Sequence, residues 1–345
     1  MHRRQFLSAG AACTSTALLA CAGAGAGASP ASARPVSRFG AESGLVGDYL
    51  DLTTPRGNRQ AQARIMGNID MESTKFGWFK GVVHGVRPGE KVRDLFGFSG
   101  FSATRLLPHD DPEEPGYKKI LREVGFYTDL ETGEVIESWY NPYLDETVRV
   151  VPIANDPFNH LITDYMIAPP NYGGLNNDMP VRVPKQLEWE RMGNLLMISA
   201  RINLFYPAAL QPEKWPRESG GRMNQVSEMF LYQMNWDDMQ NPALTSVEAT
   251  GGWVRITPWL PWMLMGPSEG HCAYTCFFGA TNTLDGVDPF VIEYAKQHYP
   301  KYLEAPEQWE EPSLSSLEWY AREQQPAPLP ADGTIPTAPL PPRPR

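Results

Sequence analysis

The sequence has little of what most catalytic signatures require. Its 345 residues contain only four cysteines and six histidines, with no HExxH zinc motif, no P-loop lysine motif and no CxxC pair. The middle of the chain also lacks the alternation of strand and helix patterns that a dinucleotide-binding fold needs. These absences argue against the commonest zinc-protease, nucleotide-binding and dithiol chemistries, and the sequence names no reaction.

Positive charge is scarce as well. The chain has 30 lysines and arginines against 40 aspartates and glutamates, which gives a formal net charge of −10. An acidic chain without a basic cluster argues against nucleic acid and anionic membrane surfaces as partners. Aromatic residues, by contrast, make up 11% of the chain, beside 33 prolines and 30 glycines. This composition favours a loop-rich β protein over a helical one.

Long apolar runs are missing too, since a membrane-spanning helix takes about 20 such residues. The short run that is present follows Arg3 and Arg4 and ends in small residues at Ala33. This pattern predicts a twin-arginine signal peptide over residues 1–33, with the export machinery as a partner and the periplasm or the exterior as the destination. An alternative is a lipoprotein signal with lipidation at Cys21.

The rest of the chain divides into three regions by pattern. Residues 34–67 have little periodicity and are predicted to be a leader. Residues 68–325 carry short alternating segments separated by proline and glycine, which predicts a single β-rich domain. Residues 326–345 are rich in proline, which predicts a disordered or extended tail.

The domain is predicted to be one mainly antiparallel sheet, curled into a barrel or half-barrel, with two C-terminal helices across its outside or one mouth. One helix is expected after Asp288-Pro289, an N-cap with a first-turn proline, and the other after the Ser315–Glu318 capping box. Clear alternation marks the strand candidates 76–86, 195–205, 226–236 and 271–280.

The stretch 123–160 is the part around which the domain is organised. Alternation places Val124 and Phe126 on one face of its first strand, and Glu123 and Tyr127 on the other. Short turns after this strand predict an antiparallel meander of three strands, the second and third being residues 135–141 and 147–153.

Four residues are candidates for catalysis: His84, His160, His271 and Arg201. A single histidine flanked by strand or turn is more often structural, and Arg201 faces either solvent or an anionic partner. Convergence of two of the four on one pocket indicates acid–base catalysis, whereas their dispersal indicates a carrier or a structural role.

Ligand binding is predicted for aromatic and amide residues of the same domain. Such residues suit a pocket for a small apolar or aromatic molecule, in which a few polar groups orient the ligand. The alternative for the tryptophans is ordinary core packing, and for some of the others the capping of a strand end. The candidates are Tyr127, Trp139, Asn141, Asn155, Trp253 and Trp262.

We expect no tightly bound metal ion and no cofactor. The best local ligand set is His271, Cys272 and Cys276, but on a strand His271 points away from both cysteines, which lie about 13 Å apart. That separation also excludes a disulfide, so the cysteines are predicted to be buried free thiols. The acidic loop 109–114 contains Pro112 and lacks the glycine that calcium loops favour.

Several composite motifs resemble the bacterial domain-of-unknown-function 1838 family. They are Thr132-Gly133-Glu134, Trp139-x-Asn141-Pro142, Asn155-Asp156-Pro157 and Pro261-Trp262-Met263-x-Met265-Gly266. The resemblance implies one domain over nearly the whole chain after the signal, with lipocalins as a structural analogy, and it supplies no catalytic residue. The sequence thus predicts an exported enzyme that acts on a small apolar or aromatic molecule in a barrel pocket. The alternative is a periplasmic carrier of such a ligand.

Overall fold

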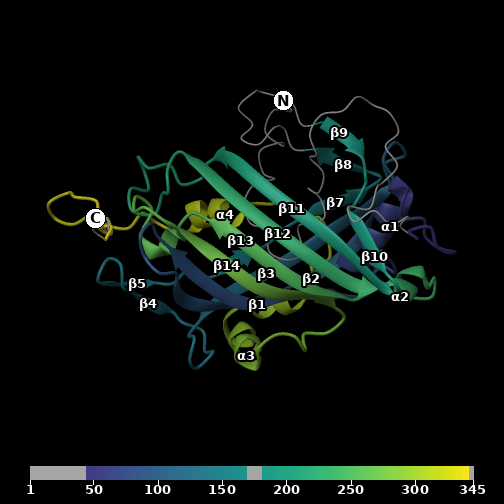
Figure 1. Cartoon of the computed structure of the whole chain (residues 1–345), viewed down its shortest axis with the longest axis horizontal. Helices are drawn as coiled ribbons and strands as arrows, with labels where there is room; N and C mark the ends of the chain where they lie inside the picture. The colour runs from purple at the N-terminus through teal and green to yellow at the C-terminus, as the bar shows by residue number, and fades with distance from the viewer. Residues whose placement is uncertain (1–43, 169–180, 342–345) are drawn as a thin grey trace.

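The computed structural model describes residues 44–168 and 181–341, and its centre is one large antiparallel sheet (Figure 1). Among these residues the spatial order of the strands is β10-β11-β12-β13-β14-β1-β2-β3-β6, and β7 pairs with the start of β3. The bounds are β1 (Lys75–Val86), β2 (Arg93–His109), β3 (Gly116–Thr128), β6 (Ile153–Asn155), β7 (His160–Thr163), β10 (Trp189–Met192), β11 (Leu195–Pro207), β12 (Met223–Asn235), β13 (Ala249–Thr257) and β14 (His271–Thr281). Two hairpins stand outside this sheet, β4 (Ser138–Asn141) with β5 (Glu146–Arg149), and β8 (Tyr165–Ala168) with β9 (Val181–Pro184).

The predicted fold class is confirmed, because the protein is mainly β and is built on one antiparallel sheet. The sheet stays open: in the described chain β10 at one edge does not pair with β6 or β7 at the other, so no barrel forms. The long strands run side by side between these edges (Figure 1). The two faces of the open sheet are therefore covered by different segments.

Alternation along the strands gives the sheet an inner and an outer face. The inner face carries Glu123 and Tyr127 of β3, and the outer face carries Val124 and Phe126, as the sequence predicts. Burial of each large apolar ring on the inner face contributes roughly 1.5–3 kcal/mol. These rings pack against one another across neighbouring strands, and they include Phe79, Phe98, Phe230, Trp253, Tyr274 and Phe278.

The predicted meander is wrong after its first strand. The chain bridges back once, from Thr128 to Val135, and then leaves the sheet. β4 and β5 pair only with each other, and the neighbours of β3 are β2 and β6. The ring of Trp139 on β4 instead lies 5.3 Å from that of Phe96 and 5.9 Å from that of Trp262. Packing of this tryptophan at the end of the inner face holds the hairpin away from the ladder.

Both predicted C-terminal helices form. α3 (Pro289–His298) has Asp288 as its N-cap and packs on the outer face, where Lys80 Nζ bonds the Asp288 carboxylate at 3.0 Å. α4 (Ser316–Glu323) has the complete Ser315–Glu318 capping box and contributes side chains to a cavity on the inner face. These two helices thus pack on opposite faces of the sheet.

Helix α1 (Pro55–Met66) lies in the region predicted to be a leader. Thr54 caps its first turn, and Arg64 is fully buried and donates to backbone carbonyl oxygens in and after the short helix α2 (Trp236–Gln240). The partners of Arg64 are more than 170 positions away along the chain. Local periodicity gives no sign of such partners, and this helix was therefore not predicted from the sequence.

The tail beyond residue 325 is extended and is held at two points. Near its start, the Ala327 amide donates to Glu218 Oε1 at 2.6 Å. Further on, the Ala338 amide donates to Ser268 Oγ at 3.0 Å, and Arg87 Nη2 donates to the Ala338 carbonyl at 2.8 Å. These bonds make the tail part of the wall of the domain.

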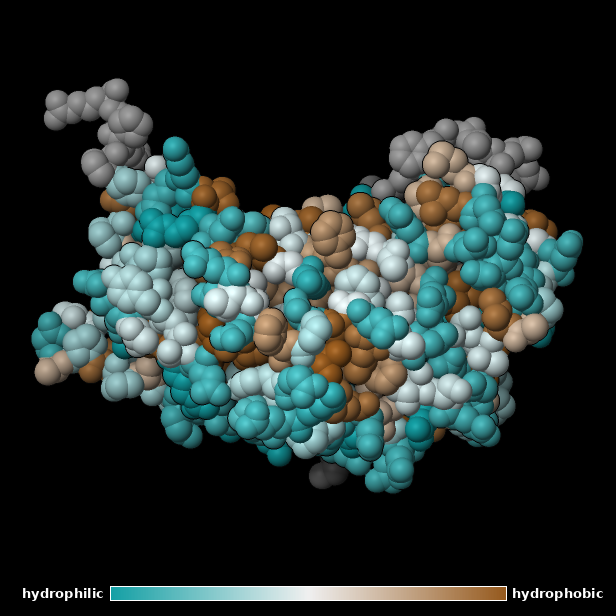
Figure 2. Space-filling view, turned by 90° about the horizontal axis from the view of Figure 1, so that it is seen from below, coloured by the Kyte–Doolittle hydropathy of each residue, from teal (hydrophilic) through white to brown (hydrophobic). Residues whose placement is uncertain are grey.

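The surface shows no broad apolar face in the view of Figure 2, where hydrophobic patches are interrupted by hydrophilic residues. In the parts of the chain that the structure describes, no helix has the length and apolar character to cross a membrane. The predicted signal over residues 1–33 lies outside the described residues.

Candidate functional site

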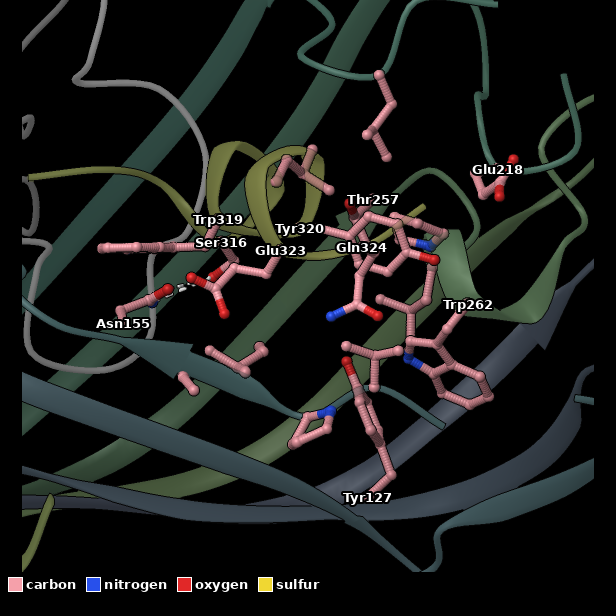
Figure 3. A pocket seen from close by; sticks show the side chains of 18 of the residues that line it. Tyr127, Asn155, Glu218, Thr257, Trp262, Ser316, Trp319, Tyr320, Glu323 and Gln324 are labelled. Atoms are coloured by element: carbon pink, nitrogen blue, oxygen red, sulfur yellow. Dashed lines mark hydrogen bonds between the residues drawn. The ribbon is translucent and has the colours of Figure 1, made fainter. Parts of the chain in front are cut away.

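A cavity of about 380 Å³ lies between the inner face and the segments packed on it (Figure 3). Its wall comes from β3, β6, β12, β13, β14 and α4, and from the 3₁₀ turns η2 (Pro261–Met263) and η3 (Pro300–Leu303). This volume is typical of small-molecule sites. The lining residues used below are Tyr127, Asn155, Glu218, Arg255, Trp259, Trp262, Tyr274, Ser316, Trp319 and Tyr320.

Aromatic rings form much of the wall. Trp262 lies 5.0 Å from Tyr127, measured between ring centres, and the Trp259 indole donates to the Ser268 carbonyl at 3.0 Å. Figure 3 shows Trp262 and Trp319 on opposite sides of the cavity, with Tyr320 between them.

Arg255 is a buried cation at this wall. The strand register places Arg255 of β13 beside Glu228 of β12 and Tyr274 of β14, so the three form one row on the inner face. Arg255 Nε lies 3.3 Å from Glu228 Oε1, and its guanidinium carbon lies 5.8 Å from the centre of the Tyr274 ring. Arg255 lines the cavity whereas Glu228 does not. Arg255 therefore presents a positive charge to the cavity, and Glu228, which does not line the cavity, compensates that charge from the side away from it.

Two tyrosines beside Arg255 complete a set of three hydrogen-bond donors. Burial raises the pKa of Tyr127 to about 12 and the pKa of Tyr274 well above its ordinary value. The Tyr274 hydroxyl donates to the Tyr127 hydroxyl, so the two phenols form one chain of donors, and the Trp262 indole lies beside Tyr127. Both phenols therefore stay protonated at neutral pH. We call Tyr127, Tyr274 and Arg255 the donor group.

A second polar part of the cavity wall consists of Asn155 and Ser316, and Glu123 holds Asn155 in position. Asn155 Nδ2 donates to Glu123 Oε1 at 2.9 Å, and Ser316 Oγ donates to Asn155 Oδ1 at 3.2 Å (Figure 3 shows the Asn155–Ser316 contact). Burial raises the pKa of Glu123 to about 8, against the opposing effects of the Asn155 hydrogen bond and nearby cations. Asn155 and Ser316 line the cavity, and Glu123 holds Asn155 in place.

Glu218 stands in the loop before β12 and is only 2% exposed. Its Oε1 accepts the hydrogen bond from the Ala327 amide, while its Oε2 is buried without a hydrogen bond among the described residues. The neighbouring Arg217 is paired with Glu146. Glu218 is thus a buried side chain on the cavity wall, with one carboxyl oxygen that has no hydrogen-bond partner among the described residues.

The structure does not bring the four predicted catalytic residues together. His84 is on the outer face, where its ring nitrogens lie 2.6 Å from Asp94 Oδ1 and 2.8 Å from Thr275 Oγ1. Arg201, also on the outer face, pairs with Glu188 at 3.2 Å. His160 packs on Phe158, with ring centres 4.7 Å apart, and His271 begins β14 at a partly exposed position. None of the four lines the cavity.

The predicted ligand-binding residues divide into two groups. Tyr127, Asn155 and Trp262 line the cavity. Trp253 packs in the inner-face core, and Asn141 holds a turn, since its Nδ2 donates to the Met263 carbonyl and its Oδ1 accepts from the Tyr143 amide. Trp139 packs behind the cavity wall against Trp262.

Arg255, Tyr274 and Glu218 are the site residues that the sequence analysis missed. Alternation along 249–257 and 271–281 places Arg255 and Tyr274 on strand faces that are otherwise mainly apolar. A polar side chain in such a position is the sequence feature that could have indicated these two site residues. Glu218 stands outside any periodic segment and has no such feature. The pattern Gly266-x-Ser268-x-Gly270 has the spacing of a nucleophile motif, but Ser268 lies before β14 and its hydroxyl accepts from Ala338.

Metal ligation finds no support in the described residues, where no three His, Cys, Asp or Glu side chains are grouped to hold an ion. Cys272 and Cys276 are buried free thiols, as predicted. Burial raises the pKa of each to about 12. They are therefore protonated at neutral pH and are poor nucleophiles.

The protein is thus of the class of mainly β proteins built on an open antiparallel sheet, with a cavity of small-molecule size on the inner face of the sheet. The chain belongs to the family described as protein of unknown function DUF1838, whose profile matches residues 72–324. This confirms the resemblance seen in the composite motifs. No curated protein matches the chain.

Proposed function

We propose that the protein is an enzyme that binds a small, largely apolar or aromatic molecule in the cavity and polarises one of its oxygen atoms with the donor group. The observation that carries this proposal is the position of Tyr127, Tyr274 and Arg255 on the wall of a cavity to which eight aromatic residues contribute. Preorganised donors in a site with little water stabilise developing negative charge more strongly than water does. A substrate with a carbonyl or phenol oxygen suits this arrangement.

A carrier of the same class of ligand is the second candidate. The dispersal of His84, His160, His271 and Arg201 favours it, because those residues supply no acid–base pair to the cavity. A carrier, however, needs only apolar lining and one or two orienting hydrogen bonds. Three donors, one of them cationic, favour a site that stabilises an oxyanion.

The test uses 4-nitrophenol, an aromatic oxygen acid whose ionised form absorbs visible light. If the donor group stabilises negative charge on oxygen, the bound probe should ionise at a lower pH than the free probe. An absorbance titration with saturating protein measures this shift. Tyr274→Phe should remove much of it, and Glu213→Gln, at an exposed position paired with Arg222, should leave it unchanged.

The outcomes separate the candidates. Binding of the probe, seen as quenching of tryptophan fluorescence, without any change in its ionisation supports the carrier. Absence of binding up to the solubility limit of the probe contradicts both candidates.

We also propose that the protein acts in the periplasm or outside the cell, reached by the twin-arginine route. Arg3 and Arg4 carry this part of the proposal. Replacing both with lysine should keep the protein in the cytoplasm on cell fractionation, and unchanged export would contradict it. Mass spectrometry of the exported chain distinguishes a mature N-terminus after Ala33 from one at a lipidated Cys21.

A further inference from the structure

We propose that Glu218 is the catalytic base of this site and that the reaction begins with abstraction of a proton from a carbon atom next to a carbonyl group. This inference rests on the proposed function, because it names the base that creates the oxyanion held by the donor group. It assigns the reaction to the class of carbon-acid proton transfers, and the substrate to apolar or aromatic carbonyl compounds with an acidic C–H bond.

The geometry of Glu218 supports this role. The residue lines the same cavity as Tyr127, Arg255 and Tyr274. Its Oε1 is held by the Ala327 amide at 2.6 Å, which orients the carboxylate from the side of the tail. Its Oε2 is buried and has no hydrogen bond within 44–168 and 181–341. A buried acceptor without a partner is costly, and a proton or donor of a ligand would satisfy it.

Glu218 is also in no ion pair with another of the described residues, although Arg149, Arg255 and Lys301 line the same cavity. Arg217, its neighbour, pairs with Glu146 and donates weakly to the Pro328 carbonyl at 3.4 Å. Tyr320, another residue of the cavity wall, has a pKa raised first by burial and second by the Glu218 carboxylate. A carboxylate that is not ion-paired remains a stronger base than one that is.

The other carboxylates near the cavity are less suited to this role. Glu123 does not line it, and with a pKa of about 8 Glu123 is mostly protonated at neutral pH. Glu228 is paired with Arg255, and Asp156 accepts from Arg122 and Lys301. Glu323 lines the cavity from an exposed position, where water can hydrogen-bond to its carboxylate in place of a ligand.

The proposed step balances without any further reactant. Glu218 Oε2 takes the proton, the electron pair of the C–H bond forms a carbon–carbon double bond, and the carbonyl pair moves to oxygen to give an enolate. The donor group holds the enolate oxygen. If a second double bond is conjugated with the enolate, return of the proton from Glu218 to the far carbon atom of the dienolate gives an isomer. If the proton on Glu218 first exchanges with water, return to the original carbon atom gives exchange of the substrate with solvent.

The test uses 5-nitrobenzisoxazole as a probe of a base in an aromatic pocket. A base removes its ring C–H proton, the pair forms a nitrile, the N–O bond breaks, and the phenolate product is coloured. We expect the protein to catalyse this elimination with a rate that rises with pH to a plateau. Glu218→Gln should lower the rate by about 100-fold or more, the usual contribution of a general base. The glutamine can still accept from Ala327, so the fold is preserved.

Matched variants make the result specific. Glu213→Gln, in the same loop but exposed and paired with Arg222, should keep the full rate. Glu218→Asp, which keeps the carboxylate one methylene shorter, should retain an intermediate rate. Equal rates for the wild type and Glu218→Gln, or no elimination above the buffer rate, would overturn the assignment of Glu218. Because 4-nitrophenol reports the donor group independently, a normal shift of its ionisation in that case leaves the proposed function standing.

Discussion

Arg255 and Arg201 show that the burial of an ion pair decides how much it contributes to the free energy of unfolding. Both stand on long strands and both pair with a glutamate, but Arg255 pairs with a fully buried Glu228 and Arg201 is about half exposed. We predict that Arg255→Met lowers the free energy of unfolding by about 3–5 kcal/mol, because it removes one partner of a buried pair. Urea unfolding measures the change.

Arg201→Met is the control for this prediction, with an expected cost of about 0–1 kcal/mol because its pair is exposed to solvent. Combining Arg255→Met with Glu228→Leu should recover much of the lost stability, since no carboxylate is then left without its arginine. Equal losses of unfolding free energy for Arg255→Met and Arg201→Met would show that burial does not make the Arg255–Glu228 pair more important for stability than an exposed pair.

Glu123 makes stability depend on pH in a direction that can be worked out. Its pKa in the folded protein is about 8, above the ordinary value of 4.5. Between these values the folded state keeps a proton that the unfolded state has released, and stability therefore falls as the pH rises. Lys119, Arg255 and Glu228 are the charged groups that face it. Lys119 has a pKa lowered by burial to about 7, which gives the opposite slope at higher pH.

We predict that Glu123→Gln gains stability relative to the wild type as the pH rises from about 5 to about 7, a window below the titration of Lys119. Unfolding free energies measured in urea at several pH values in this window test the prediction. Parallel curves for the two proteins would mean that Glu123 does not hold its proton in the folded state.

At the scale of elements, the contact between β1 and β14 depends on a glycine. Gly81 is paired with Cys276, and a Cβ atom at Gly81 would lie 2.2 Å from the Thr275 carbonyl oxygen and 2.6 Å from Cys276 Cα. We predict that Gly81→Ala destabilises the protein by about 1–3 kcal/mol, because the backbone of β14 has to move. Gly252 on β13 has no heavy atom nearer than 4.0 Å to such a Cβ.

Gly252→Ala is therefore the matched control, and its effect on the unfolding free energy should stay within about 1 kcal/mol. Thermal unfolding of the two variants makes the comparison. A tolerated alanine at residue 81 would show that β1 and β14 are less closely packed than described.

At the scale of the whole molecule, the tail is attached to the domain at two points, one at Glu218 on the cavity wall and one at Ser268, whose carbonyl accepts from Trp259 of the same wall. Ala327 bonds Glu218 at the cavity, whereas Ala338 bonds Ser268 and Arg87. Ending the chain at residue 325 removes both attachments, and ending it at residue 329 removes only the second. We predict that both truncations lower the melting temperature by a few degrees, as a loss of about 1 kcal/mol would.

Only the shorter chain should open the cavity, because it alone loses the bond to Glu218. Acrylamide quenching of tryptophan fluorescence reports this, since Trp259, Trp262 and Trp319 line the cavity. Quenching that is equal in the two truncated proteins would contradict a role of the tail in closing the site.

Much of the local structure followed from the sequence alone. The two faces of β3, the alternation of β11, β12 and β14, and the capping box of α4 were all predicted, because each depends on residues within a few positions of one another. Of the six residues predicted to bind the ligand, Tyr127, Asn155 and Trp262 line the cavity, whereas Trp139, Asn141 and Trp253 do not.

The tertiary structure alone decided which segments meet. β3 pairs with β6 and not with the nearer β4, and Glu218 receives its hydrogen bond from a residue 109 positions away. Arg255 and Glu228 pair because the register of β12 against β13 places them opposite each other. Such pairings depend on packing energies summed over the whole sheet, and many registers satisfy the same local alternation. For this reason the donor group and the proposed base emerged only from the folded molecule.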